Sequence, residues 1–233
     1  MTIDPAVRDR LGLNLDYPSL AAASAAADRL APWFGIVKVG FELFIAEGPP
    51  AVEKFRAAGF KVFLDIKLHD IPNTVRSGAR AAGRLGATYV NMHTLGGVEM
   101  VRAGVEGLAE GAAAAGVEAA VPIGVTVLTS DKTADPAEVE RRMAIGRDGG
   151  CGGFVCAAAE VGTANRVAPG LITIIPGIRL PGADAHDQGR PATPTDAIKA
   201  GATVLLLGRT VTQAPEPEAA AQQAYDEVVS ALA

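Results

Sequence analysis

The chain alternates between short apolar runs and longer segments in which apolar and charged residues recur at helical spacing. The runs rich in Val, Ile and Leu predict buried strands, and the Ala-, Arg- and Glu-bearing segments between them predict helices. The predicted strands are Leu11–Asp16, Gly35–Gly40, Lys61–Lys67, Thr88–His93, Ala119–Leu128, Gly153–Ala157, Ile172–Pro176 and Thr203–Gly208. The predicted helices are Leu20–Leu30, Pro50–Ala58, Asn73–Leu85, Val98–Ala115, Pro136–Asp148, Glu160–Val167, Pro194–Ala200 and Pro217–Leu232.

Strand and helix alternate eight times, which predicts an α/β protein with the (β/α)8 TIM barrel fold, because strands covered by helices are apolar on both faces. A doubly wound open sheet is the alternative. Its dinucleotide-binding version is disfavoured, because Leu15-Asp16-Tyr17-Pro18 follows the first strand where a G-x-G-x-x-G loop is needed. No low-complexity linker interrupts the sequence, so we expect residues 1–233 to form a single barrel domain.

Composition narrows the function classes. Hydrophobic residues make up 49% of the 233 residues, which is typical of a folded domain. The 26 acidic and 21 basic residues give a net charge of -5, so the basic excess of a nucleic-acid binder is missing. The first ten residues do not resemble a secretory signal, and no apolar run reaches the ~20 residues of a membrane helix. We therefore expect a cytoplasmic protein with neither a nucleic-acid nor a membrane partner.

The third predicted strand carries charge at its carboxyl end. Because side chains alternate along a strand, Asp65 and Lys67 share one face with Phe63. Barrel active sites lie where the strands end, so the pair enters the predicted mouth together. A structural ion pair remains the alternative, since a buried charge needs a compensating partner.

Two further charged groups lie close to this pair. Lys38 ends the second strand and Asp70 follows Lys67 by three residues. Four groups of alternating sign would keep both lysines protonated and make one of them a cationic proton donor. For Asp70 an N-cap of the helix that begins near Pro72 is the competing interpretation.

A phosphate site is predicted at the last two strands. Arg179 follows the seventh strand, and Gly208 and Arg209 end the eighth, where barrels frequently bind phosphate. The planar guanidinium pairs well with phosphate, and Gln188 in the long loop adds an amide donor. That loop, residues 179–195, is long and polar, and we hypothesise that it closes over the phosphate.

The remaining polar candidates give weaker signals. Thr126 and Thr129 offer hydroxyls near the end of the fifth strand, and His93 is expected at the rim or in the core. His69 and His186 have no partners at metal-ligand spacing, so no metal site is expected. A metal-free site with a protonated lysine and a bound phosphate ester suits chemistry through a carbanion. Decarboxylation, aldol cleavage and isomerisation all remain open.

One run resembles the signature of a known enzyme family, orotidine 5′-phosphate decarboxylase: Leu64-Asp65-Ile66-Lys67-Leu68-His69-Asp70-Ile71-Pro72-Asn73-Thr74-Val75. Further matching pieces follow in order along nearly the whole chain: Asp16, Val37-Lys38-Val39-Gly40, Val125 to Ser130, Pro176-Gly177-Ile178-Arg179, Asp187-Gln188 and Gly208-Arg209. The resemblance implies decarboxylation of orotidine 5′-phosphate to UMP and carbon dioxide in pyrimidine biosynthesis. It also implies that the reaction needs no cofactor or metal.

The same resemblance assigns roles to residues. Lys67 would protonate the C6 carbanion, Asp65 would lie beside the substrate carboxylate, and Asp70 and Lys38 would complete the charged array. The implied substrate contacts are Asp16 and Lys38 to the ribose, Thr129 to the pyrimidine, and Arg179, Gln188, Gly208 and Arg209 to the 5′-phosphate. A homodimer is implied, in which Asp70, Ile71 and Thr74 reach into the neighbouring subunit's site.

Two rival functions stay open. Sugar-phosphate enzymes of the same superfamily, 3-keto-L-gulonate 6-phosphate decarboxylase and hexulose-phosphate synthase, resemble this chain at the Asp-x-Lys-x-x-Asp spacing. They use magnesium held partly by a glutamate near the end of the second strand, where Lys38 stands here. The other rival is a catalytically silent barrel that binds a nucleotide phosphate, which the intact Lys67 with its two carboxylates argues against.

Overall fold

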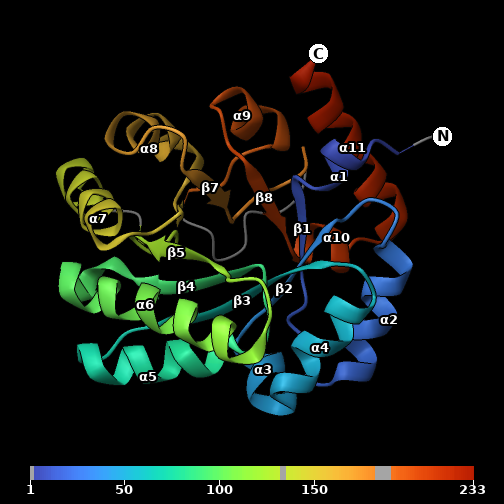
Figure 1. Cartoon of the computed structure of the whole chain (residues 1–233). Coiled ribbons are helices and arrows are strands. Elements are labelled where there is room, and N and C mark those ends of the chain that lie inside the picture. The colour runs from blue at the N-terminus through green and yellow to red at the C-terminus, as the bar shows by residue number, and fades with distance from the viewer. Residues whose placement is uncertain (1–2, 132–134, 182–189) are drawn as a thin grey trace.

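The fold is a closed barrel of parallel strands. The computed structural model describes residues 3–131, 135–181 and 190–233. Within these ranges eight strands pair in chain order from β1 to β8, and β8 pairs back to β1. Helices surround the barrel, and α11 packs beside α1 (Figure 1). The predicted (β/α)8 TIM barrel is confirmed, and the doubly wound sheet is excluded.

The strands lie close to their predicted ranges: β1 Leu11–Asn14, β2 Ile36–Val39, β3 Lys61–Leu68, β4 Tyr89–His93, β5 Val121–Val125, β6 Gly153–Val155, β7 Ile172–Ile175 and β8 Val204–Leu207. The predicted helices are α2 Leu20–Leu30, α4 Pro49–Ala57, α5 Pro72–Gly83, α6 Gly97–Ala115, α7 Pro136–Gly149, α8 Val161–Val167, α9 Pro194–Lys199 and α11 Pro217–Leu232. Short elements were not predicted: α1 Pro5–Arg8, α3 Phe41–Glu47, α10 Arg209–Thr212 and the 3-10 turns Thr94–Gly96 and Ala158–Glu160.

The fifth strand is shorter than its apolar run. It ends at Val125, three residues before the predicted end, because the chain turns out of the sheet at Thr126. The Thr126 hydroxyl donates to the carbonyl oxygen of Val155 at 3.1 Å, which fixes this departure. Thr126 and Thr129 therefore follow the strand rather than alternate along it.

Apolar side chains fill the barrel and the layer around it. The interior cluster consists of Ile36, Phe63, Tyr89, Ile123, Ile174, Val204 and Leu206. The larger cluster between strands and helices includes Leu64 of β3 and Val75 of α5. The predicted alternation of β3 is thus confirmed, since Phe63 points inward and Leu64 outward. The next inward position is Asp65, at the carboxyl end of the barrel.

Helix α5 follows β3 and packs closely against α6. A side chain at Gly107 or Gly111 of α6 would collide with the backbone carbonyl oxygens of Arg76 and Arg80 in α5. The absence of these side chains allows the two helices to touch. None of the helices in the described ranges has the length and apolar character of a membrane span.

Candidate active site

A charged array lies at the ends of β2 and β3, with Lys38 and Asp65 buried and Lys67 partly exposed. Lys67 Nζ lies 2.6 Å from Asp65 Oδ1, and Lys38 Nζ lies 3.4 Å from Asp65 Oδ2. Lys38 Nζ also donates to Asp16 Oδ1 at 2.9 Å. Because one carboxylate contacts two ammonium groups, Asp65 is the centre of the array. The sequence-based prediction that Lys38, Asp65 and Lys67 meet is confirmed, and Asp16 joins them.

Burial and charge act against each other in this array. Burial alone would lower the pKa of Lys38, but the charges of Asp65 and Asp16 and the hydrogen bonds to them outweigh it and raise that pKa. Burial alone would raise the pKa of Asp65, but the charges of Lys38 and Lys67 and hydrogen bonds lower it. Lys38 is therefore an ammonium and Asp65 a carboxylate at neutral pH.

The backbone at Lys67 is strained. Its φ of 43° is the only positive φ among the described residues other than glycine. A left-handed conformation costs a side-chain-bearing residue roughly 1–2 kcal/mol. The strained residue is the one whose ammonium contacts Asp65. Backbone strain in proteins clusters at functional sites, so this observation supports a functional role for Lys67.

Asn91 of β4 belongs to the site although the sequence analysis did not single it out. It is 0% exposed. Its amide nitrogen donates to Asp65 Oδ1 at 2.6 Å, and its amide oxygen accepts from the backbone N–H of Lys67 at 2.7 Å. An Asn in the middle of an apolar strand was the available signal, because a buried amide needs partners.

Two residues after β2 shape the space around the lysines. The ring of Phe41 lies 5.4 Å from Lys67 Nζ, at cation–π distance. A Cβ atom at Gly40 would come within 2.6 Å of Lys38 Nζ. The bare backbone at Gly40 therefore leaves room for the Lys38 ammonium.

Asp70 does not join the array of its own chain. Its side chain is exposed, and its Oδ1 accepts from the N–H of Ile71 at 2.6 Å. The expected convergence of four groups is therefore wrong for Asp70 within one subunit, because the chain turns away after β3. The N-cap interpretation is also wrong: α5 has Ile71 at its N-cap, and no side chain caps it. Ile71 and Thr74 are exposed beside Asp70.

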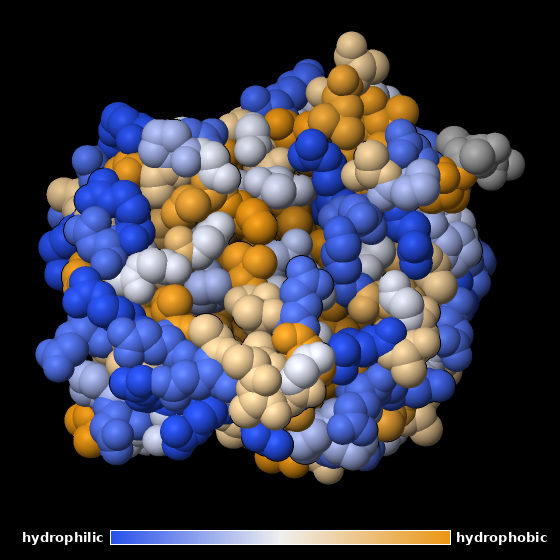
Figure 2. All heavy atoms as spheres, viewed as in Figure 1, coloured by the Kyte–Doolittle hydropathy of each residue, from blue (hydrophilic) through white to orange (hydrophobic). Residues whose placement is uncertain are grey.

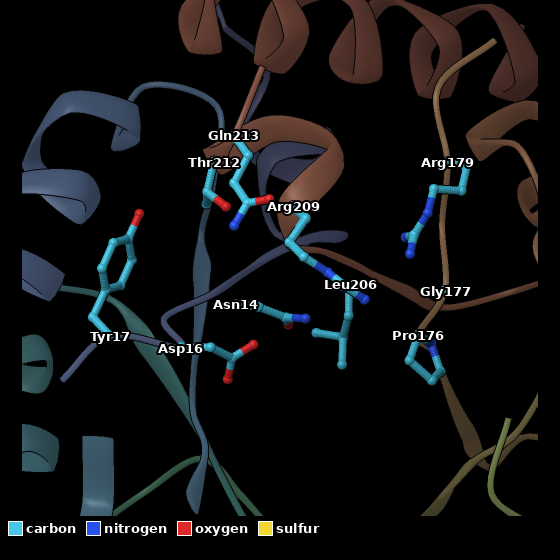
Figure 3. A pocket seen from close by; sticks show the side chains of 11 residues that line it. Asn14, Asp16, Tyr17, Pro176, Gly177, Arg179, Leu206, Arg209, Thr212 and Gln213 are labelled. Atoms are coloured by element: carbon cyan, nitrogen blue, oxygen red, sulfur yellow. The ribbon is translucent and has the colours of Figure 1, made fainter. Parts of the chain in front are cut away.

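A cavity of about 420 Å³ opens at the ends of β7, β8 and β1. Arg179, Arg209 and Asn14 point into it (Figure 3). The lining residues are Asn14, Asp16, Tyr17, Pro176, Gly177, Arg179, Leu206, Gly208, Arg209, Thr212 and Gln213. Four predicted substrate contacts thus lie in one cavity: Asp16, Arg179, Gly208 and Arg209. Asp16 also contacts Lys38, so the cavity and the charged array share a wall.

Two guanidinium groups line the cavity, and their positive charge favours an anionic ligand. Arg179 is 8% exposed. Burial, and secondarily the charge of Arg209, lowers the pKa of the Arg179 guanidinium. A dianionic phosphate between the two guanidinium groups would offset their repulsion and pair with both planar forks.

Two further predicted substrate contacts lie apart from the array and the cavity or outside the described residues. Gln188 and most of the loop after Arg179 lie outside the described residues, so the closure hypothesis for that loop stays a prediction. Thr129 is half-buried in a turn after β5.

His93 ends β4, and its ring lies 5.6 Å from that of His69. The buried Nδ1 of His93 has no hydrogen-bond partner among the described residues. Burial, followed by the electrostatic influence of His69, Lys67 and Arg142, lowers the pKa of His93.

Comparison with known proteins identifies the family. The model of the orotidine 5′-phosphate decarboxylase / HUMPS family matches residues 9–224. The chain belongs to this family. The resemblance found in the sequence and the prediction of an enzyme are thereby confirmed.

Individual relatives agree in name. A protein of Anaeromyxobacter sp. (strain K) named orotidine 5′-phosphate decarboxylase is 43% identical over 219 residues, covering 92% of this chain and 96% of the relative. One of Moorella thermoacetica with the same name is 41% identical, covering 95% and 92%. The crystal structure of orotidine 5′-phosphate decarboxylase from Lactobacillus acidophilus superposes with a TM-score of 0.79 at 30% identity, covering 94% of this chain and 99% of that one.

Proposed function

We propose that this protein decarboxylates orotidine 5′-phosphate to UMP and carbon dioxide, and that it acts in pyrimidine biosynthesis. The names of its relatives support the reaction. The observation that carries the proposal is the pairing of Lys67 with Asp65 beside an arginine-lined cavity. A carbanion needs a proton and nearby positive charge, and a nucleotide needs a phosphate anchor, and this arrangement offers both.

Lys67 is the proposed proton donor. Its ammonium lies 2.6 Å from Asp65, whose lowered pKa means that Asp65 does not take up the proton at neutral pH. When carbon dioxide leaves, the electron pair of the broken bond stays on C6. The Lys67 ammonium gives its proton to that carbon, which forms UMP. Asp65 lies beside the departing carboxylate and orients Lys67, and Lys38 adds positive charge.

The distant phosphate anchors the substrate. Arg179, Gly208 and Arg209 are the proposed 5′-phosphate contacts, with Gln188 from the adjoining loop. Asp16 and Lys38 are the proposed ribose contacts, since they join the cavity to the array. Thr129 is the proposed pyrimidine contact. Binding energy from the phosphate can then hold the reacting ring against Lys67.

A reaction without metal or cofactor is part of the proposal. The Asp-x-Lys-x-x-Asp run is shared with magnesium-dependent relatives, so the run alone does not separate the two chemistries. Here Lys38 Nζ lies 3.4 Å from Asp65 Oδ2 and Lys67 Nζ lies 2.6 Å from Oδ1. A divalent cation at Asp65 would have to displace two ammonium groups, and their charge opposes its binding.

The test follows the absorbance of orotidine 5′-phosphate with purified protein in excess EDTA. We expect the absorbance to decay for the wild type. Lys67→Ala should slow turnover by about 10⁴-fold or more, because the proton donor is lost. UMP affinity measured by calorimetry should change little, since the phosphate cavity is intact. No decay with folded wild-type protein would contradict the proposed reaction, and decay that requires added magnesium would contradict its independence of metal.

We further propose a homodimer with shared sites. Exposed apolar side chains follow β2 to β5, on the same side as Asp70: Phe41, Ile45, Ile71, Leu95 and Leu128. On the face that Figure 2 shows, apolar and hydrophilic side chains are both exposed, and the five residues above are not marked there. Exposed apolar groups of this kind are typical of interaction surfaces. The exposed Asp70, Ile71 and Thr74 would reach the partner's array across this surface.

Mixing inactive subunits tests the shared site. Lys67→Ala and Asp70→Asn proteins should each be nearly inactive. After unfolding and refolding together in equal amounts, about a quarter of the wild-type activity should return, because half the dimers are mixed and each holds one intact site. Sedimentation of the separate proteins as dimers is the control. Dimers that regain no activity would contradict the sharing of sites.

A further inference from the structure

We infer that Asn91 is a positioning residue for the reaction: it holds the Asp65 carboxylate and the Lys67 backbone in the arrangement in which the lysine can deliver its proton. The inference rests on the proposed decarboxylation. Asn91 lies in β4, away from the phosphate cavity, and no role for it follows from the signature run of β3.

The position of Asn91 explains how the end of β3 keeps its shape. From Leu64 to Leu68, β3 advances four residues, while its partner β4 advances two, from Val90 to Met92. The extra residues of β3 cannot all pair with the β4 backbone. The Asn91 side chain supplies a substitute, because its oxygen accepts the N–H of Lys67 at 2.7 Å. The bond lies at the residue with φ of 43° and holds it in that conformation.

The same side chain fixes the partner of the Lys67 ammonium. Asp65 Oδ1 accepts from Asn91 Nδ2 and from Lys67 Nζ, each at 2.6 Å. Asn91 is completely buried, so water does not compete for its amide. The Asn91 amide therefore positions Lys67 at two points. It binds the Lys67 backbone N–H directly, and it holds the Asp65 carboxylate that binds the Lys67 ammonium.

The contacts of Asn91 with Asp65 and with the Lys67 backbone require a donor and an acceptor in the same side-chain group. An amide offers both in one plane, whereas an ionised carboxylate offers only acceptors. In Asn91→Asp, one carboxylate oxygen would face Asp65 Oδ1 at hydrogen-bond distance. Two carboxylates this close share a proton, which raises one pKa of the pair. The protonated form restores the donor, and the ionised form repels Asp65.

The experiment measures kcat and KM for orotidine 5′-phosphate across pH for the wild type, Asn91→Ala and Asn91→Asp. Asn91→Ala should lower kcat about 10²-fold at all pH values, with KM and UMP affinity within a few-fold of the wild type. For Asn91→Asp, the ratio of its kcat to the wild-type kcat should be highest at the acidic end. That ratio should fall as the pH rises, because the shared proton is lost.

Thr173→Val is the matched control. Thr173 is buried in β7, and its hydroxyl accepts from the N–H of Thr203 at 3.1 Å, so the variant loses a buried hydrogen bond outside the array. It should lower the melting temperature but leave kcat unchanged. Asn91→Ala with a kcat within about threefold of the wild type would overturn the inference. So would an Asn91→Asp ratio that does not depend on pH.

A crystal structure of Asn91→Ala gives a readout independent of turnover. We expect Lys67 to leave the positive-φ region, or its Nζ to move away from Asp65 Oδ1. A Lys67 that keeps both its backbone and its contact without Asn91 would overturn the inference. If wild-type protein fails to consume orotidine 5′-phosphate, the proposed function fails, and this structure still decides whether Asn91 positions Lys67.

Discussion

The two halves of the barrel mouth differ in how their charged side chains are arranged. At the ends of β2 and β3, each lysine is paired with a carboxylate of the same chain, at 2.6 to 3.4 Å. At the ends of β7 and β8, Arg179 and Arg209 share a cavity, and the charge of Arg209 helps to lower the pKa of Arg179. The array thus pairs opposite charges at short distance, whereas the cavity places two like charges along one wall.

Under the proposed function, this difference separates the groups that bind the substrate from those that react with it. Groups that must act on a reacting atom need their geometry set before the substrate arrives, and internal ion pairs set it. Groups that only bind need no such internal pair to orient them, and two guanidinium groups at one cavity suit the oxygens of a phosphate. Asp16 joins the two halves, since it lines the cavity and contacts Lys38.

Removal of Asp65 should have the largest effect. Asp65→Ala leaves the Lys67 and Lys38 ammonium groups close together without their shared carboxylate. We expect kcat to fall by about 10⁴-fold and the free energy of unfolding by about 3–5 kcal/mol. Steady-state kinetics and urea unfolding measure the two.

A surface pair provides the control for that stability loss. Lys61 and Asp9 form a bridge of 2.8 Å at the opposite end of the barrel, with both side chains more than 40% exposed. Asp9→Ala should cost less than about 1 kcal/mol and leave kcat unchanged. An equal stability loss in both variants would contradict the picture of a buried, balanced array.

The arginine cavity should respond in KM more than in kcat. Arg209→Ala removes one fork of the proposed phosphate clamp, so kcat/KM for orotidine 5′-phosphate should fall about 10²-fold, mainly through KM. Orotidine without phosphate should react equally slowly with both proteins. A loss of the same size with orotidine would place Arg209 in another role.

Gly40→Ala should give a smaller and more selective effect. The backbone at Gly40, with φ -93° and ψ -171°, accepts alanine, but the added Cβ would come within 2.6 Å of Lys38 Nζ. The ammonium must move, so we expect kcat/KM to fall about tenfold with little change in stability. Gly162→Ala is the control, since a Cβ at Gly162 meets nothing within 4 Å. Equal activity of the two variants would contradict the steric argument.

Acid should weaken the charged array at the ends of β2 and β3. The pKa of Asp65 is lowered in the folded protein, so its contribution to stability is complete above the unfolded value of about 3.9. That contribution is lost as the pH falls through the folded pKa. The difference in unfolding free energy between the wild type and Asp65→Asn should therefore shrink below about pH 4. A constant difference down to pH 2 would show that Asp65 contributes no linked stability.

Strand period and apolar runs predicted the barrel because both signals are local. Each β/α unit repeats them, so single errors at an end did not disturb the fold. The predicted fifth strand is too long, because Thr126 and Leu128 continue its β-prone composition. The turn that ends the strand depends on a hydrogen bond from Thr126 to Val155 of β6, which the composition does not reveal. Short helices such as α3 carry too few residues to display a period.

The site was predictable where neighbouring strand ends bring residues together. Lys38 and Asp65 follow this rule, and so do Arg179 and Arg209. Asp70 does not follow this rule, because β3 ends at Leu68 and Asp70 lies in the connection to α5, where strand alternation no longer sets the direction of a side chain. Asn91 was missed because its role needs the register shift between β3 and β4, which no local pattern encodes.

The left-handed backbone at Lys67 is tied to the contact that its side chain makes. Substitution by glycine would relieve the strain, but it would also remove the ammonium that pairs with Asp65 and give the unfolded chain more freedom. The roughly 1–2 kcal/mol of relieved strain is smaller than the cost of breaking a buried pair. The ion pair therefore compensates for the backbone that carries it, and neither feature can be changed without the other.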